Sequence, residues 1–294
     1  MQEIIYSFII PHKNCPDLLQ RCVDSIPVRD NVQVIVIDDN SDVEKKPHID
    51  RKGVEVILLD ASQSKGAGRA RNVGLEHARG KWLLFADADD YFSDYLSHVL
   101  DRYVSDDNTE MVFLNARMFN EKGETKKLNL NALIENYING VEGAESTLRY
   151  GFWTPWSRMI KRSIVTSHGI MFDETMARND KNFVLECSSY AKTVRAEEEF
   201  VYNYFRPLYG SQTDRKRTVS ILDDMIAIVR RTNEIYDRVG YKHKYSYLQL
   251  FWKTSFVSNM SKKEVLCKYL STLRKNGTNL CKDINYFIKN RKQK

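Results

Sequence analysis

Three of four consecutive positions are aspartates at the end of the apolar run in WLLFADADDYF, residues 82–92. The carboxylates of Asp87, Asp89 and Asp90 should lie close together there, and like charges at short range disfavour ionisation. A divalent cation would relieve this repulsion, because Mg²⁺ and Mn²⁺ prefer oxygen ligands and keep open positions for water or phosphate. The alternative is structural, since aspartates at strand ends also cap helices and form turns.

The segments that would hold these aspartates alternate between strand and helix patterns. Apolar runs rich in β-branched residues predict strands, and the amphipathic stretches between them predict helices. Strands joined by intervening helices predict an α/β fold with a parallel, doubly wound sheet. The predicted strands cover residues 4–10, 32–38, 54–60 and 81–87, and the predicted helices cover residues 16–26 and 68–78.

Each predicted strand ends in polar residues. The four stretches are PHKN at 11–14, DDNSD at 38–42, DASQSKGAG at 60–68 and DADD at 87–90. Ligands of open α/β sheets bind outside the carboxyl ends of the strands. One edge of the sheet is therefore predicted to be acidic, rich in loops and the place where a ligand binds.

Length and composition limit the class of protein. The chain has 294 residues, of which 42% are hydrophobic and 29% charged, as expected of a soluble globular protein with ample core. Its five cysteines form no CxxC pair, which indicates a reduced, cytoplasmic protein. The apolar run at 4–10 is too short to span a membrane and lacks the basic start of a signal peptide, so neither an anchor nor an export signal is predicted.

Three segments resemble, in order and spacing, the amino-terminal half of a glycosyltransferase family 2 enzyme with a GT-A fold. They are YSFIIPHKNCPDLLQRCVDSI, VQVIVIDDNSD and SKGAGRARNVGLEHARGKWLLFADADDYF. The shared outline is an apolar strand with a small polar loop, a DDxSxD element, a G-x-x-x-ARN-x-G helix and a DxDD metal motif. A looser likeness continues through 155–191 and 201–213, about seven tenths of the chain in all. The resemblance implies a Rossmann-like, mostly parallel sheet flanked by helices.

The resemblance also implies a binding site for a nucleotide-sugar donor. Pro11 and Asp39 would line the nucleobase and ribose pocket, with Asp39 accepting a hydrogen bond from a base N–H. Gly68, together with Gly66, would let the backbone approach the nucleotide, and Arg71 would reach it. Alternatives remain open: one of Asp38 and Asp39 forms an Asx-type turn, and Arg71 is a solvated residue of an amphipathic helix.

By the same resemblance, Asp87 and Asp89 would hold Mn²⁺ or Mg²⁺ and the ribose-diphosphate of the donor. The metal neutralises charge on the departing nucleoside diphosphate, and Asp90 would support or cap the motif. Asp180 falls on the position of the general base that takes the acceptor's proton, which commits the chain to inversion. Asn179 replaces the usual glutamate of the acidic pair. Asp180 could also be the N-cap of a helix over 181–190.

The second half would shape the acceptor site. Trp156 is the candidate for stacking on an acceptor sugar, because aromatic faces bury the apolar C–H surface of sugar rings; core packing is the alternative, above all for Trp153. Arg206, Ser211 and Gln212 lie in a stretch that resembles the family's late loop over the donor, where they would contact the diphosphate.

From residue 218 onward strand patterns disappear and amphipathic helices are predicted. From Lys262 onward the chain has ten Lys and Arg residues but only two acidic residues, Glu264 and Asp283. That stretch therefore carries a net charge of +8, while the whole chain carries +6. Three interpretations are open: a solvated helix face, docking on an anionic inner-membrane surface, and nucleic-acid binding. Nucleic acid is the least favoured, because no segment matches a base-reading module.

The sequence thus predicts a catalytic domain over 1–215, with a nucleotide-binding half (1–105) and an acceptor-binding half (106–215), followed by a basic helical extension over 216–294. Its function would be transfer of a sugar, with inversion, from a nucleotide sugar, expected to be a UDP-sugar, to a hydroxyl of a glycan or lipid-linked saccharide in cell-surface polysaccharide synthesis. The alternative is a catalytically weak, sugar-nucleotide-binding scaffold for other glycan-assembly enzymes, favoured by Asn179. A nucleotidyltransferase is less favoured, because PHKN is not a glycine- and lysine-rich phosphate loop.

Overall fold

The computed structural model describes residues 3–175, 178–206, 219–255 and 261–292. Within these residues one sheet of nine strands runs in the order β3-β2-β1-β4-β8-β6-β9-β5, and β7 pairs with β6. Its strands are β1 (Tyr6–His12), β2 (Val32–Asp38), β3 (Val54–Leu58), β4 (Trp82–Phe85), β5 (Tyr91–Phe92), β6 (Met111–Phe119), β7 (Thr125–Lys127), β8 (Arg158–Lys161) and β9 (Val194–Phe205).

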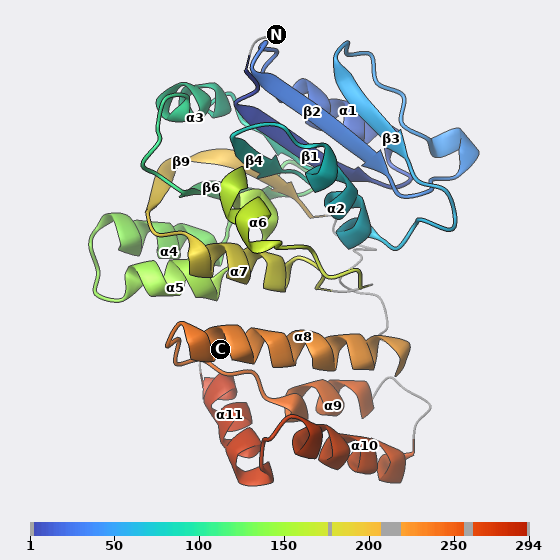
Figure 1. Cartoon of the computed structure of the whole chain (residues 1–294), viewed down its shortest axis with the longest axis vertical. Helices are drawn as coiled ribbons and strands as arrows, with labels where there is room; N and C mark the ends of the chain where they lie inside the picture. The colour runs from blue at the N-terminus through green and yellow to red at the C-terminus, as the bar shows by residue number, and fades with distance from the viewer. Residues whose placement is uncertain (1–2, 176–177, 207–218, 256–260, 293–294) are drawn as a thin grey trace.

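Helices surround this sheet and continue beyond it (Figure 1). Those of the first 190 residues are α1 (Pro16–Asp24), α2 (Ala67–His77), α3 (Leu96–Tyr103), α4 (Asn129–Ile138), α5 (Ala144–Gly151), α6 (Arg162–His168) and α7 (Lys181–Tyr190). Those of the carboxy-terminal part are α8 (Val219–Arg238), α9 (Tyr247–Ser255), α10 (Lys262–Lys275) and α11 (Leu280–Lys292).

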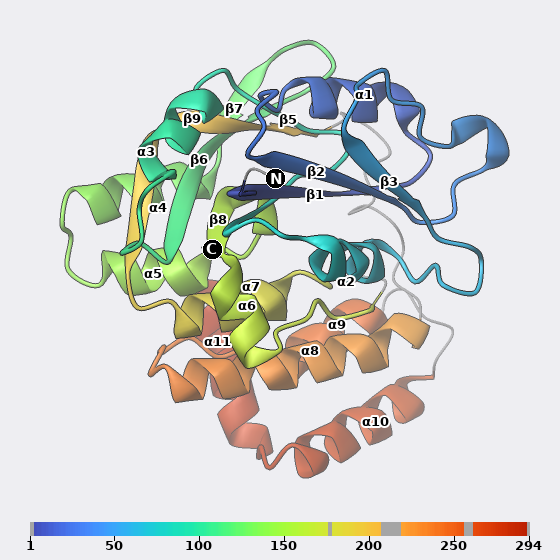
Figure 2. The same ribbon diagram turned by 45° about the horizontal axis from the view of Figure 1, so that its top comes forward.

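The first half has the predicted α/β architecture. Strands β3, β2, β1 and β4 are parallel neighbours, with Ile9 opposite Ile35 in β2 and Phe85 in β4. Every residue of β1 is buried, as expected of a central strand covered on both faces. Figure 2 shows α1 on one face of these strands and α2 on the other. The prediction of a doubly wound, parallel amino-terminal sheet is therefore confirmed.

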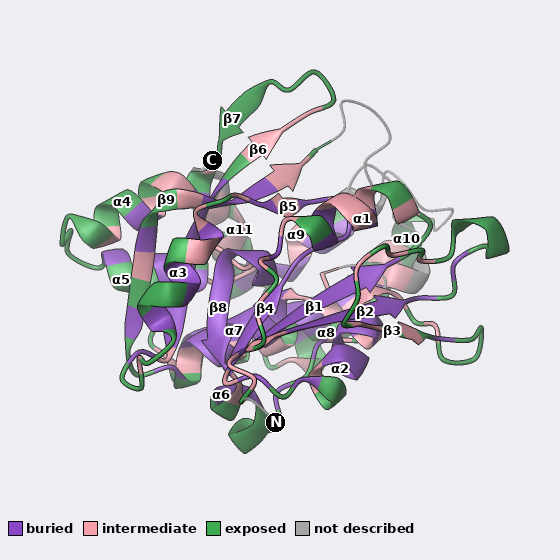
Figure 3. Cartoon of the chain, turned by 90° about the horizontal axis from the view of Figure 1, so that it is seen from above, coloured by how far each residue is buried: buried purple, intermediate pink, exposed green. Residues whose placement is uncertain are grey.

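The second half adds antiparallel pairs to the same sheet. Strand β8 runs antiparallel to both β4 and β6, whereas the long strand β9 runs parallel to β6 and then pairs with the short strand β5. This last pairing matters for the site, because β5 begins directly after the aspartate run. Strand β9 thus brings residues more than a hundred positions away against the end of β4. Figure 3 shows that the central strands are the most buried part of the molecule.

The carboxy-terminal helices form a second, smaller core. It is built from apolar residues of α8, α9 and α10 with Tyr247 at the start of α9. The carboxylate of Asp283 in α11 is fully buried and accepts hydrogen bonds from the backbone N–H groups of Tyr247 and Leu248 and from the hydroxyl of Tyr269. Asp283 therefore ties α11 to both α9 and α10. The predicted boundary at 215–216 lies outside the described residues.

In the part of the chain that the structure describes, no helix combines enough length with enough apolar character to cross a bilayer.

Candidate functional site

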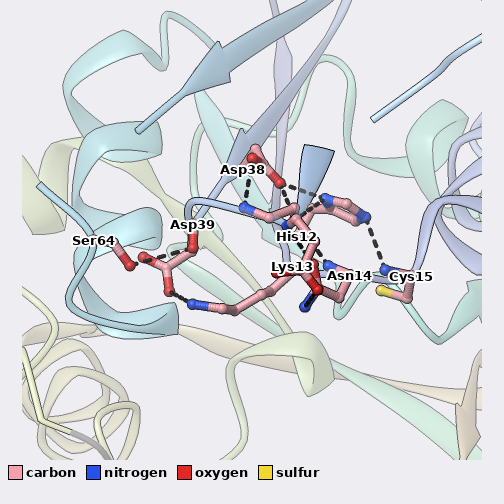
Figure 4. Close-up of polar contacts among 9 residues, drawn as sticks. His12, Lys13, Asn14, Cys15, Asp38, Asp39 and Ser64 are labelled. Carbon is pink, nitrogen blue, oxygen red and sulfur yellow. Dashed lines mark hydrogen bonds and ion pairs between the residues drawn. The ribbon is translucent and has the colours of Figure 1, made fainter. Parts of the chain in front are cut away.

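Buried polar contacts hold the loops that follow β1 and β2. His12, at the end of β1, places its Nδ1 2.8 Å from the carboxylate of Asp38, at the end of β2, and its Nε2 accepts the backbone N–H of Cys15 (Figure 4). Asp38 also accepts hydrogen bonds from the backbone N–H and the hydroxyl of Ser41. The Asx-type alternative therefore applies to Asp38, which is occupied in fixing the two loops.

Asp39 contacts residues of the loops after β1 and β3. One carboxylate oxygen lies 3.4 Å from Nζ of Lys13, and the other accepts the backbone N–H of Gly66 at 3.3 Å. The carbonyl of Asp39 accepts the hydroxyl of Ser64. Asp39 thus joins the loops after β1, β2 and β3, at the edge where the sequence predicts the nucleobase. Pro11 is buried within β1, one residue before the strand ends at His12.

The aspartate run forms a turn whose three carboxylates have different surroundings. Asp90 is fully buried, and its carboxylate accepts the hydroxyl of Tyr202 at 2.7 Å and the backbone N–H of Phe205 at 2.6 Å. The same Tyr202 hydroxyl accepts the backbone N–H of Asp87. Burial, followed by the charges of Asp87 and Asp89, raises the pKa of Asp90 well above its usual range. Asp90 supports the turn, whereas Asp87 and Asp89 are only partly buried.

Arg71 connects this turn with the segment before α7. Its guanidinium lies 2.6 Å from the carboxylate of Asp87 and donates a second hydrogen bond, of 3.0 Å, to the side-chain oxygen of Asn179. The Arg71 side chain is only 7% exposed and lies 5.5 Å from the ring of Phe172. Arg71 is therefore not a solvated residue of an amphipathic helix, because Asp87, Asn179 and Phe172 bury its side chain.

Asp180 lies at the N-cap position of α7 but does not act as a side-chain cap, because its carboxylate makes no capping hydrogen bond. Burial raises the pKa of Asp180 to about 6, an effect that the nearby charge of Arg71 opposes. A carboxylate with a pKa near neutrality is suited to proton transfer at physiological pH. Helix α7 has the predicted bounds and begins at the next residue.

Gly68 lies at a close contact between α2 and the segment before α7. A Cβ at Gly68 would lie 2.2 Å from the backbone oxygen of Asp173 and 3.0 Å from Cβ of Asn179. The glycine therefore permits α2 to approach the segment that carries Asn179 and Asp180, and this close contact accounts for it without a nucleotide. Gly66 adopts a φ of +85°, which favours glycine, and a Cβ there would meet nothing within 4 Å.

Asp87 and Asp89 are the carboxylates expected to bind the metal ion. Among the described residues, no group of three or more His, Cys, Asp or Glu side chains could hold a metal ion. Mg²⁺ is usually bound through one or two carboxylates plus waters and substrate phosphates, and Asp87 and Asp89 supply two carboxylates. Burial, followed by the charge of Asp87, raises the pKa of Asp89 to about 6. The residues therefore fit a metal that arrives with a diphosphate.

Trp156 is placed differently from a residue that stacks on a ligand. It is 4% exposed, and its ring stacks on those of Tyr202 and Tyr204 with interplanar angles of 7° and 14°. Direct stacking on an acceptor sugar would require the ring to be uncovered. Trp156 instead packs behind the aspartate turn through Tyr202. Arg206 is exposed, whereas Ser211 and Gln212 lie outside the described residues.

Two residues of the site were not singled out from the sequence. Tyr202 orders the aspartate turn, and Arg21 in α1 donates a 2.6 Å hydrogen bond to the carbonyl of Asp89 while its guanidinium lies 5.0 Å from the ring of Tyr91. The spacing of Tyr202 in β9 gives no sign of its partner, because that partner is set by the β5–β9 pairing. Arg21 resembles any charged residue on an amphipathic helix.

A cavity of about 1130 Å³ lies away from these residues. Its lining comes from the amino-terminal ends of β1 and β4 and from the end of β8, and it includes Lys81, Asp107 and Lys161. These strand ends are opposite to the edge that carries Asp39 and Asp87. None of the candidate site residues lines the cavity, so its size does not make it the ligand site of an α/β sheet.

Comparison with known proteins places the chain in a family. The model of glycosyl transferase family 2 matches residues 7–169, more than half of the chain. The succinoglycan biosynthesis protein ExoO of Rhizobium meliloti is 27% identical over 239 residues, which are 75% of this chain and 66% of that protein. The UDP-Glc:alpha-D-GlcNAc-diphosphoundecaprenol beta-1,3-glucosyltransferase WfaP of Escherichia coli is 24% identical over 260 residues, which are 84% of this chain and 92% of that protein.

Solved structures show the same fold. Residues 1–349 of S. aureus TarS in complex with UDP-GlcNAc align with a TM-score of 0.65 and 15% identity, over 93% of this chain and 80% of that one. This likeness confirms the expected GT-A architecture. The chain spans only 61%, 66% and 60% of the length of three curated relatives that it matches.

Proposed function

This chain belongs to glycosyltransferase family 2, and on that premise we propose that it transfers a sugar, with inversion, from a nucleotide-sugar donor to a hydroxyl of a glycan or lipid-linked saccharide. The observation that carries the proposal is the bridge made by Arg71, which joins Asp87 of the aspartate turn to Asn179, next to Asp180. One guanidinium thereby couples the group expected at the donor diphosphate to the group expected to act as base.

The donor would lie across the carboxyl ends of the parallel strands. Asp39, with Pro11 beneath it, would receive the base and ribose, and a UDP-sugar is the donor we favour. Support comes from two relatives: WfaP carries UDP-Glc in its name, and TarS was crystallised with UDP-GlcNAc. Asp87 and Asp89 would hold Mn²⁺ or Mg²⁺, which supplies charge neutralisation for the leaving diphosphate when bound.

Asp180 would take the proton of the acceptor hydroxyl as that oxygen attacks the anomeric carbon from the face opposite the diphosphate. The carbon–oxygen bond to the acceptor forms while the bond to the diphosphate breaks, which inverts the anomeric centre. Arg71 would hold Asp87 and, through Asn179, the segment that ends in Asp180. Asn179 keeps an oxygen acceptor for Arg71 where the family usually has a glutamate, so the exchange preserves this contact.

A scaffold that binds the sugar nucleotide without turnover is the second candidate. The observation in its favour is Asn179, because an amide adds no negative charge beside Asp180. The two candidates differ in one measurable property: a scaffold binds donor and does not cleave it.

The basic carboxy-terminal helices suit contact with an anionic membrane, where lipid-linked acceptors reside. Large apolar side chains are exposed on α9, α10 and α11 among lysines and arginines, a combination typical of interfacial helices. They are Trp252, Leu266, Leu270, Leu280, Ile284 and Ile288. Replacing both Leu270 and Ile284 with glutamate should reduce co-sedimentation with phosphatidylglycerol-containing vesicles, while Val141→Glu, at an exposed site in another part of the molecule, should not. Equal binding by all variants would exclude this surface.

The proposed function is tested by measuring hydrolysis of a panel of UDP-, GDP- and dTDP-sugars, with Mn²⁺ and with a chelator, alongside Asp180→Asn. Slow metal-dependent cleavage of one donor, lost in the variant, would support an inverting transferase and identify the donor. Tight metal-dependent binding without cleavage, also in the presence of lipid-linked saccharide acceptors, would support the scaffold instead.

A further inference from the structure

The segment that carries Asp180 is held from two sides. On one side are Gly68 and Arg71 of α2, described above. On the other side is the carboxy-terminal part of the chain, because α8 packs along α7 (Figures 1 and 2). Helix α8 contacts α7 near both of its ends: Arg238 bonds Glu186 and Ser189 near the carboxy-terminal end, and Thr232 bonds Asn182 near the amino-terminal end, close to Asp180.

The first contact is a buried chain of hydrogen bonds. The hydroxyl of Thr232 in α8 donates to the side-chain oxygen of Asn182 at 2.9 Å, and the amide nitrogen of Asn182 donates to the carboxylate of Asp173 at 2.9 Å. Thr232 and Asn182 are both fully buried. The backbone N–H of Asp173 in turn donates to the carbonyl of Asn179 at 3.0 Å. The chain therefore runs from α8 to the residue before Asp180.

Two further contacts reinforce it. The guanidinium of Arg231 in α8 lies 3.0 Å from the other carboxylate oxygen of Asp173. Lys181, the residue after Asp180, is fully buried, and its Nζ has no hydrogen-bond partner among the described residues but lies 3.3 Å from the centre of the Tyr245 ring. Tyr245 is itself fixed to α8, because its backbone N–H and carbonyl both bond the side chain of Asn233.

We propose that Arg231, Thr232 and Tyr245 form a latch that positions Asp180, so that the carboxy-terminal extension is part of the catalytic machinery. This inference rests on the proposed function of Asp180. The latch touches neither donor nor acceptor; it acts through Asp173, Lys181 and Asn182 on the direction of the base. Its members are therefore positioning residues, and their loss should affect the chemical step far more than donor binding.

The chain offers a matched set of variants. Thr232→Val preserves shape and removes the hydroxyl, whereas Thr232→Ser keeps the hydroxyl. Thr272→Val is the control, because Thr272 is another buried threonine of the extension whose hydroxyl donates only to the carbonyl of Lys268 within its own helix. The readouts are kcat for the donor that the unsubstituted chain cleaves fastest, the Kd of UDP with Mn²⁺, and hydrogen exchange of a peptide covering 178–186.

Displacement of a catalytic group by about 1 Å costs about 10²-fold in rate. We expect Thr232→Val to lower kcat by about 10- to 100-fold, to leave the Kd of UDP unchanged and to speed exchange over 178–186. Thr232→Ser should restore kcat, and Thr272→Val should leave kcat and this exchange as they were. Unchanged kcat and exchange in Thr232→Val would overturn the latch, as would an equal loss of kcat in Thr272→Val.

The same measurements distinguish failure of the proposed function from failure of the latch. If the unsubstituted chain cleaves no donor even in the presence of lipid-linked saccharide acceptors, the proposed activity is refuted, and the exchange experiment alone then decides whether α8 holds this segment. Faster exchange over 178–186 in Thr232→Val but not in Thr272→Val would sustain the latch as a structural element. Equal exchange in both variants would remove it.

Discussion

Replacing Gly68 with alanine should disturb the site through a single added methyl group. The new Cβ would lie 2.2 Å from the backbone oxygen of Asp173, whereas close carbon-to-oxygen contacts are usually about 3.3 Å. Helix α2 and the Asp173 segment must therefore separate by about 1.1 Å. Because φ of Gly68 is not in the left-handed region, an alanine without this clash would stabilise the helix by about 0.5–1 kcal/mol.

Because of the clash, Gly68→Ala should destabilise the protein instead of stabilising it. Overpacking of a closely fitted contact costs about 1–3 kcal/mol, and a shift of about 1 Å at Asn179 and Asp180 should lower turnover about 10²-fold. Urea unfolding and donor hydrolysis measure the two effects. Gly151→Ala is the matched control, because a Cβ at this helical glycine makes only an ordinary 3.5 Å contact with Thr147. Gly68→Ala with unchanged stability and turnover would refute the account of how α2 positions the base.

Three other outcomes follow from the site. Turnover should rise with pH through about 6 and then level off, because the base acts when ionised and burial raises the pKa of Asp180 to about 6. At pH 5 about a tenth of the plateau rate should remain. A rate that is flat from pH 5 to 8 would assign the proton transfer to another group. Asp89→Ala should abolish the Mn²⁺ dependence of UDP binding measured by calorimetry with little change in thermal stability, and normal Mn²⁺-dependent affinity would remove Asp89 from the metal site. Tyr202→Phe should lower the free energy of unfolding by about 1–3 kcal/mol, because the buried carboxylate of Asp90 and the N–H of Asp87 both lose a partner. Denaturation by urea at neutral pH measures this change. An unchanged free energy of unfolding would mean that water replaces the hydroxyl.

The sequence predicted the first half of the fold well because its signals are local. Periodic apolar runs identify β1, β2, β3 and β4, and the same runs place their carboxyl ends, with Asp39 and Asp87, at one edge. The bounds of α2 and α7 were predicted to within a residue. Long, strongly periodic elements of this kind depend little on the rest of the chain.

Side-chain partners across the fold could not be predicted in the same way. Tyr202 meets Asp90 only because β9 pairs with β5, and Gly68 meets Asp173 only because the segment before α7 returns to α2. Trp156 was expected to face a sugar, yet the Tyr202 and Tyr204 rings cover it. The contacts of Tyr202 and Trp156 depend on strand order in the second half, where the mixture of parallel and antiparallel pairs has no local signature.

The net charge of the carboxy-terminal stretch is a count from the sequence, which does not predict the role of one acid within it. Asp283 counts as one of only two negative charges there, and the structure buries it where it accepts hydrogen bonds from the start of α9 and from Tyr269. Composition does not reveal such a contact, because a buried carboxylate and a solvated one have the same letter in the sequence.

In the proposed reaction, Asp180 acts as a base for direct displacement at the anomeric carbon. The most direct measurement is the configuration of the sugar first released when the protein hydrolyses its donor, followed by proton NMR before the anomers equilibrate. We expect that water, activated by Asp180, gives the anomer opposite to that of the donor, and that Asp180→Asn slows its release by about 10²- to 10⁴-fold. Release of the anomer found in the donor, at a rate that Asp180→Asn leaves unchanged, would contradict it.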